Sequence, residues 1–127
     1  MSTRNRLGNC KNQFQGPSKR VLTVCSAGLL RSPTAAWVLS NDPWNFNCRA
    51  AGYNEEYALV LVDQVLLTWS DVVVCMDETQ RHHLEKLLEK FGMNKPVHNL
   101  EVEDDYDFRD PGLVKLMTEK FRVLFPV

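Results

Sequence analysis

The amino-acid sequence predicts a single α/β domain, a doubly wound sheet of about four parallel strands with helices on both faces. Short runs rich in β-branched residues, such as RVLTV at 20–24 and DVVVCM at 71–76, alternate with segments of helical periodicity. This alternation is typical of βαβ units. The chain has 127 residues, 44% of them hydrophobic, so it can bury one core and is too short to build a second.

The chain begins with residues 1–18, which lack apolar periodicity, carry basic but no acidic side chains and end in Gly-Pro-Ser. We interpret them as a flexible basic arm ahead of a domain that spans 19–127. The first strand leads into a helix over 32–42, whose Ser-Pro opening suits the N-cap and first-turn positions. A weaker strand follows at 45–52.

The second half repeats the alternation. Length favours a helix over 57–69, and the strand at 71–76 is followed by a helix over 77–92 that opens with Asp and closes with Gly. A short strand at 95–100 and a last helix at 111–125 complete the domain. Ligands of such sheets bind outside the carboxyl ends of the strands, where strand order reverses, so we expect the site in the loop after the first strand.

That loop has the composition of a phosphate-binding turn. From Cys25 it continues through Ser26, Ala27, Gly28, Leu29, Leu30, Arg31 and Ser32. Successive backbone N–H groups and the start of the following helix form a concave anion site, and Gly28 can adopt the left-handed backbone that the turn needs. Arg31 would contribute a planar guanidinium that binds two phosphate oxygens. We therefore expect phosphate or sulfate to bind residues 26–32.

Cys25 is the predicted nucleophile. A free thiol is only a few per cent ionised at pH 7, so a nucleophilic cysteine needs its thiolate stabilised. The helix end, the converging N–H groups and Arg31 would favour that thiolate, and Ser32 can add a hydrogen bond to the sulfur. A buried structural cysteine with an unrelated arginine is the alternative, but the preceding strand, the glycine and the Ser-Pro that follows favour function.

At these residues the sequence resembles the low-molecular-weight protein tyrosine phosphatase family, whose signature is Cys, five residues, Arg, Ser or Thr, and usually Pro. Cys25, Arg31, Ser32 and Pro33 match it. Residues 49–52 are similar to that family's Ser-Ala-Gly stretch, and residues 70–76 to its Ala-Asp-hydrophobic-Met strand. The resemblance covers about residues 20 to 124. It is strongest to a compact subgroup of predicted phosphatases from bacteria and phages, in which an Asp-Asp-Tyr segment precedes a terminal helix that opens with Asp-Pro.

The resemblance implies a two-step phosphatase mechanism without metal or other cofactor, in which Cys25 takes the phosphoryl group and water hydrolyses the phosphocysteine. Its substrate would be a phosphorylated protein or a small aryl phosphate. Two residues depart from the family pattern. Leu30 replaces a second loop cysteine, so Cys25 lacks an adjacent resolving partner. Gly28 replaces an asparagine and removes a side-chain brace from the loop.

The mechanism needs a carboxylic acid to protonate the leaving oxygen, a contribution of roughly 10²–10⁴-fold. Aligning the acidic segment 101–111 with the family's hydrophobic-x-Asp-Pro-aromatic loop indicates Asp104, with Asp105 as second candidate. Asp110 precedes Pro-Gly and is explained as the N-cap of the last helix, which leaves it third. A solvated acidic loop without chemistry is the alternative.

Four other functions use a similar loop. Arsenate reduction requires further cysteines in a mobile segment, whereas Cys75 lies in a strand and no cysteine follows it. A phosphocysteine carrier of sugar-transport systems would need neither Arg31 nor an acid loop. A non-catalytic phosphopeptide-binding relative would be distinguished from an enzyme by the turnover of an aryl phosphate. Arginine phosphatases carry a small Thr where Leu29 stands, which favours phosphotyrosine here.

The remaining residues predict no second chemistry. Four cysteines without a C-x-x-C pair and three histidines without ligand spacing predict no metal and no disulfide scaffold, and hence a cytoplasmic setting. We expect neither a membrane nor a nucleic acid as partner. Trp44, Tyr53 and Tyr106 could line a pocket for an aromatic leaving group, although each could also be a core residue. We expect His82 and His83 to lie in solvent. We expect Cys48 and Cys75 to lie in the core.

Overall fold

The computed structural model describes residues 9–10, 19–26, 31–54, 56, 58, 60–103 and 109–126. Its strands are β1 (Asn9–Cys10), β2 (Arg20–Cys25), β3 (Asn47–Gly52), β4 (Val72–Cys75) and β5 (Val97–Asn99). Its helices are α1 (Arg31–Leu39), α2 (Gln64–Trp69), α3 (Glu78–Lys90) and α4 (Pro111–Leu124). None of these helices is long and apolar enough to cross a bilayer.

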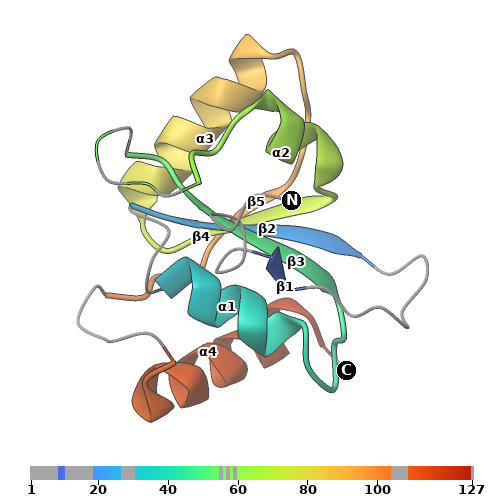
Figure 1. Cartoon of the computed structure of the whole chain (residues 1–127), viewed down its shortest axis with the longest axis vertical. Coiled ribbons are helices and arrows are strands. Elements are labelled where there is room, and N and C mark those ends of the chain that lie inside the picture. The colour runs from blue at the N-terminus through green and yellow to red at the C-terminus, as the bar shows by residue number, and fades with distance from the viewer. Residues whose placement is uncertain are drawn as a thin grey trace.

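The strands form one sheet in the order β1-β3-β2-β4-β5. The four strands from β3 to β5 are parallel, and the helices that connect them lie on both sides of the sheet (Figure 1). This confirms the predicted doubly wound α/β fold. Because β3 and β4 lie on opposite sides of β2, the strand order reverses at β2, where a ligand site is expected.

A fifth strand, β1, was not predicted. It pairs antiparallel with β3 through Asn9 opposite Arg49 and Cys10 opposite Cys48, so two residues of the predicted arm join the sheet. Two residues are too few for an alternating pattern to be visible in the sequence. Their pairing covers peptide groups of β3 that would otherwise form an open sheet edge.

The hydrophobic core predicted for the domain is divided by the sheet into two clusters, here called the α1/α4 core and the α2/α3 core. One core lies against α1 and α4, and the other lies against α2 and α3 (Figure 1). Side chains alternate along β2, so Val21 and Cys25 face the α1/α4 core while Leu22 and Val24 face the other. Cys25 therefore points to the same side of the sheet as the helix that follows it.

The prediction of a helix over 57–69 was wrong for its first half. Helix α2 covers only Gln64–Trp69, and Asp63 caps it by accepting a hydrogen bond from the Leu66 N–H at 2.9 Å. Residues 60–62 are extended beside the end of β3, where the Gly52 N–H donates to the Val60 carbonyl and the Val62 N–H donates to the Gly52 carbonyl, both at 2.8 Å. Their β-branched side chains suit an extended backbone better than a helix.

The predicted boundaries of the later helices are confirmed. Asp77 caps α3, which ends just before Gly92 with its positive φ of 66°, and Asp110 caps α4 ahead of Pro111. Helix α1 begins at Arg31, one residue earlier than predicted, so Ser32 and Pro33 lie inside its first turn.

Candidate active site

Cys25 is the last residue of β2, and only 3% of its surface is exposed. Its Sγ lies 3.1 Å from the Oγ of Ser32, the contact that the sequence predicted. The Ser32 hydroxyl donates to the Ala51 carbonyl oxygen at 3.3 Å, and the side chain is fully buried. If Cys25 ionises, the single Ser32 hydroxyl proton can turn from Ala51 to the thiolate, because a hydroxyl rotates to suit its acceptor.

Thr23 holds β2 against α1, the helix that follows it. Its Oγ1 donates to the Ser32 carbonyl oxygen at 2.7 Å, and the side chain is fully buried. Thr23 and Cys25 share one face of β2 because side chains alternate along a strand. The end of β2 and the first turn of α1 are thus tied together by two contacts, one from each residue.

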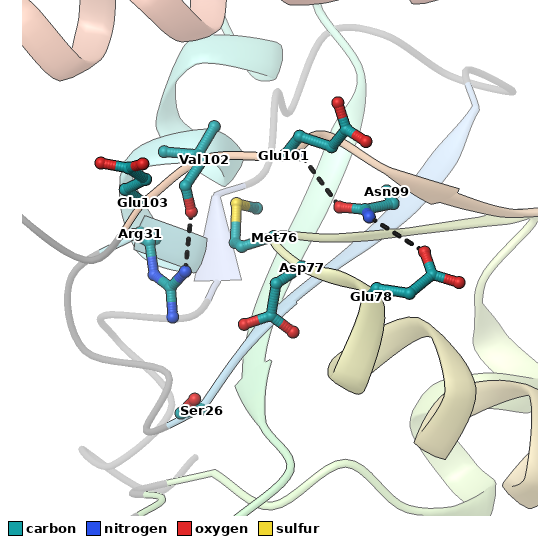
Figure 2. Close-up of a pocket in the computed structure, with 9 residues that line it drawn as sticks. All are labelled: Ser26, Arg31, Met76, Asp77, Glu78, Asn99, Glu101, Val102 and Glu103. Atoms are coloured by element: carbon teal, nitrogen blue, oxygen red, sulfur yellow. Dashed lines mark hydrogen bonds between the residues drawn. The ribbon is translucent and has the colours of Figure 1, made fainter.

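Arg31, the first residue of α1, is buried to 96%, with 4% exposure. Its Nη1 donates to the Val102 carbonyl oxygen at 2.8 Å (Figure 2). The guanidinium therefore connects the start of α1 to the segment after β5. Residues 27–30 lie outside the described residues, so the roles of Ala27, Gly28, Leu29 and Leu30 stay predictions.

A pocket of about 620 Å³ opens beside Arg31 (Figure 2). Its lining residues follow β2, β4 and β5: Ser26, Arg31, Met76, Asp77, Glu78, Asn99, Glu101, Val102 and Glu103. The carboxyl ends of neighbouring parallel strands meet at one edge of the sheet, which explains why three distant segments border one pocket. Two residues of the predicted phosphate site, Ser26 and Arg31, line this pocket.

The segment after β5 is held by hydrogen bonds to the end of β4. The Leu100 N–H donates to the Cys75 carbonyl at 2.8 Å, and the Val102 N–H donates to the Met76 carbonyl at 2.9 Å. Between them Glu101 has a φ of +56°, in the left-handed region that non-glycine residues rarely adopt. This backbone presents the Val102 carbonyl to Arg31.

The acid candidates are only partly covered by the described residues. Asp104 and Asp105 lie outside them and stay predictions. Asp110 is the N-cap of α4, with Oδ1 accepting from the Gly112 N–H at 2.8 Å, as its position before Pro-Gly predicted. The neighbouring Arg109 N–H donates to Thr34 Oγ1 of α1 at 2.9 Å.

Gln80 is a site residue that sequence reasoning missed. It lies in the first turn of α3, its side chain is fully buried, and its Nε2 is 3.4 Å from Ser26 Oγ. Its Oε1 accepts from the Met76 N–H at 2.7 Å. The Asp-x-x-Gln spacing from Asp77 was the available signal. It predicts a capping box, in which the Gln80 side chain would accept from the backbone N–H of Asp77, whereas in the structure it accepts from that of Met76.

The aromatic candidates have separate positions. Trp44 is a core residue whose ring packs on Phe121 at 6.0 Å between centroids. Tyr53 lies beside Cys25, because its N–H donates to the Cys25 carbonyl at 3.1 Å. Its ring packs 5.1 Å from that of His83, which is half-buried, whereas His82 is exposed. Tyr106 lies outside the described residues.

The other buried cysteines have no visible role at this pocket. Cys48 and Cys75 are fully buried, as predicted. Burial, followed by the nearby charge of Asp77, raises the pKa of Cys75 to about 12. Cys75 belongs to the α2/α3 core, on the opposite side of the sheet from Cys25.

Neither a protein-family model nor a curated protein sequence matches this chain. Solved structures do match. Wzb from Vibrio vulnificus, in complex with benzylphosphonate, has a TM-score of 0.66 at 17% identity over 84% of this chain and 97% of that one. The tyrosine phosphatase Wzb from Escherichia coli K30, in complex with phosphate, has a TM-score of 0.64 at 14% identity over 84% and 96%. A low-molecular-weight phosphotyrosine phosphatase from Vibrio cholerae O395 gives 0.63 at 19% over 85% and 97%.

The chain has the fold of the low-molecular-weight tyrosine phosphatases. In this phosphatase fold, the predicted nucleophile ends the central strand β2 and the predicted phosphate-binding arginine begins α1. The structure brings Cys25, Ser26, Arg31 and Ser32 together at one end of the sheet. Asp110 instead caps the N-terminus of α4.

Proposed function

We propose that this chain is a phosphomonoester hydrolase of the low-molecular-weight protein tyrosine phosphatase family, acting through a phosphocysteine intermediate. One observation carries the proposal: the Cys25 sulfur lies 3.1 Å from the Ser32 hydroxyl at the carboxyl end of β2. A hydroxyl at this distance can donate its proton to a thiolate, and the stabilised thiolate is the better nucleophile. Arg31, which starts the same helix turn, supports the assignment of a phosphate-binding loop.

In the proposed first step, the Cys25 thiolate attacks phosphorus. An S–P bond forms while the P–O bond to the leaving group breaks, and the leaving oxygen takes a proton from a carboxylic acid, for which Asp104 is our first candidate and Asp105 the second. In the second step that carboxylate takes a proton from water, whose oxygen attacks phosphorus. The S–P bond breaks, and inorganic phosphate and the Cys25 thiolate are released.

We propose phosphotyrosine as the substrate, in a protein or in a small aryl phosphate. Tyr53 supports an aromatic leaving group, because its backbone is hydrogen-bonded to Cys25 and its ring packs on His83 at the surface of α3. Leu29 supports the same choice on sequence grounds. The complexes of the two Wzb proteins with benzylphosphonate and with phosphate agree with an aryl phosphate site in this fold.

The position of Cys75 argues against arsenate reductase chemistry on this fold. Such a relay needs a second thiol that reaches the nucleophile, and Cys75 is buried on the other face of the sheet. A pKa of about 12 also keeps it a thiol at neutral pH, and thiols are poor nucleophiles compared with thiolates.

The decisive experiment is hydrolysis of p-nitrophenyl phosphate by the wild type and by Cys25→Ser, with Cys75→Ala as the matched control. We expect turnover by the wild type and the control, and none by Cys25→Ser. Turnover by Cys25→Ser at the wild-type rate would refute the mechanism. Phosphate binding without turnover in the wild type would instead support a non-catalytic phosphopeptide-binding module.

A further inference from the structure

A chain of hydrogen bonds with a fixed direction leads to Ser26. It starts at the Met76 backbone N–H, which can only donate, and the Gln80 Oε1 accepts from it at 2.7 Å. This contact fixes the orientation of the Gln80 amide, because the opposite orientation would bring two donors together. The amide NH₂ therefore faces Ser26 Oγ, at 3.4 Å.

Gln80 has no freedom to reverse this direction. Its side chain is fully buried, and its own N–H donates to Asp77 Oδ1 at 2.8 Å, which anchors the first turn of α3. A buried amide keeps its partners because an unsatisfied polar group costs about 1–3 kcal/mol. The Gln80 NH₂ is thus a permanent donor directed at Ser26.

The Ser26 hydroxyl has one proton to donate and lone pairs to accept with. Since Gln80 donates to a lone pair, the hydroxyl proton is left for another acceptor. Among the residues that the structure describes, no acceptor for this proton lies within hydrogen-bonding distance of Ser26 Oγ. Ser26 is half-buried and borders the same pocket as Arg31 (Figure 2).

We propose that the Ser26 hydroxyl donates a hydrogen bond to the oxyanion bound in the pocket, and that Gln80 is the positioning residue that directs this proton. This inference rests on the proposed function, since it requires an oxyanion in the loop after β2. It adds a side-chain donor to the backbone N–H groups and the Arg31 guanidinium that the sequence predicts for this site. Hydrogen bonds with a charged partner are the stronger ones, so its loss is measurable.

Calorimetric titration with sulfate tests the donor. We expect Ser26→Ala to bind sulfate about tenfold to a hundredfold more weakly than the wild type, and Ser26→Thr, which keeps the hydroxyl, to bind within a few-fold. Ser40→Ala is the matched control, because Ser40 Oγ donates to the Trp37 carbonyl at the far end of α1. Equal sulfate affinity in Ser26→Ala and the wild type would overturn the proposal.

Gln80→Glu tests the direction of the chain. The new carboxylate still accepts from the Met76 N–H, but it also attracts the Ser26 proton and turns it away from the pocket. We expect weaker sulfate binding at pH 7, recovering toward the wild-type value in acid as the new carboxyl group protonates and can donate. In Ser26→Ala the same substitution should weaken binding much less. Equal losses in both backgrounds would indicate charge repulsion alone and overturn Gln80 as the positioning residue.

The outcomes separate this inference from the proposed function. No sulfate binding by the wild type, together with no turnover of p-nitrophenyl phosphate, would overturn both. Sulfate binding and turnover by the wild type, with Ser26→Ala unchanged in both, would overturn only the role of Ser26. Thermal unfolding of each variant confirms that the protein is folded at the temperature of the titration.

Discussion

At the scale of single residues, Arg31 has two tasks that a lysine cannot share. Its guanidinium is buried and donates to the Val102 carbonyl, and we propose that it also binds phosphate oxygens. A planar, forked donor set can do both, whereas an ammonium is a point charge. We expect Arg31→Lys to lower kcat/KM for p-nitrophenyl phosphate by about 100-fold or more.

The control for this substitution is Arg122→Lys, which makes the same change at an exposed position of α4. It should leave kcat/KM at the wild-type value. Near-normal activity of Arg31→Lys would remove Arg31 from the phosphate site.

The general acid is tested by the dependence of rate on the leaving group. Asp104→Asn should slow phenyl phosphate by roughly 10²–10⁴-fold and p-nitrophenyl phosphate much less, since nitrophenolate departs without a proton. The alkaline limb of the kcat profile should also disappear. If Asp105→Asn shows both effects and Asp104→Asn shows neither, the acid is one residue further along the chain.

At the scale of elements, Asp71 joins the start of β4 to the start of β2. It accepts from the Arg20 backbone N–H at 2.9 Å, and its own N–H donates to the Arg20 carbonyl at 2.8 Å. The Arg20 N–H, more than its guanidinium, holds the pKa of Asp71 below its usual value of 3.8. A lowered folded-state pKa means that ionised Asp71 stabilises the fold.

We therefore expect Asp71→Asn to lower the free energy of unfolding at pH 7, by less than about 1 kcal/mol because the pair is half exposed. The contribution is present above the unfolded pKa near 3.8 and is lost as the pH falls through the lower folded-state pKa. Denaturant unfolding at pH 7 and pH 3 measures the difference. Glu119→Gln, at an exposed position of α4, is the control, and a gap that stays constant between the two pH values would contradict this role.

The elements also show how far sequence reasoning reaches. Helix α3 was predicted closely because Asp77 and Gly92 mark its two ends locally. Residues 60–62 were predicted wrongly because their extended backbone depends on bonds of Val60 and Val62 to Gly52, which no local pattern reveals. Likewise Cys25 and Arg31 were visible in one short motif, whereas the role of Gln80 depends on a contact with Ser26, 54 positions away.

At the scale of the whole molecule, the sheet keeps two cysteines in separate environments. Cys25 faces the α1/α4 core at the pocket end of β2, and Cys75 is enclosed in the α2/α3 core. We expect iodoacetate at pH 7.5 to alkylate Cys25 in the native protein and to leave Cys75 unmodified. Mass spectrometry of the labelled peptides checks this, with unfolded protein as the control in which both react.

The buried thiol of Cys75 also predicts a loss of stability in alkali. Its folded-state pKa of about 12 exceeds the usual value of 9.0, so the thiol contributes stability that is complete below pH 9 and is lost as the pH rises toward 12. The fall in unfolding free energy above pH 9 should be smaller in Cys75→Ala than in the wild type. Parallel curves for the two proteins would contradict this assignment.

The hydrogen bond from Arg31 to Val102 joins residues 71 positions apart. Contacts that close long stretches of chain form slowly during folding, because the entropy of loop closure opposes them until the rest of the sheet is in place. The pocket walls come from segments after β2, β4 and β5, so the pocket is complete only when β5 has paired with β4. During refolding, recovery of the proposed turnover should therefore follow recovery of helical circular dichroism. The time at which activity returns would then report when β5 has paired with β4.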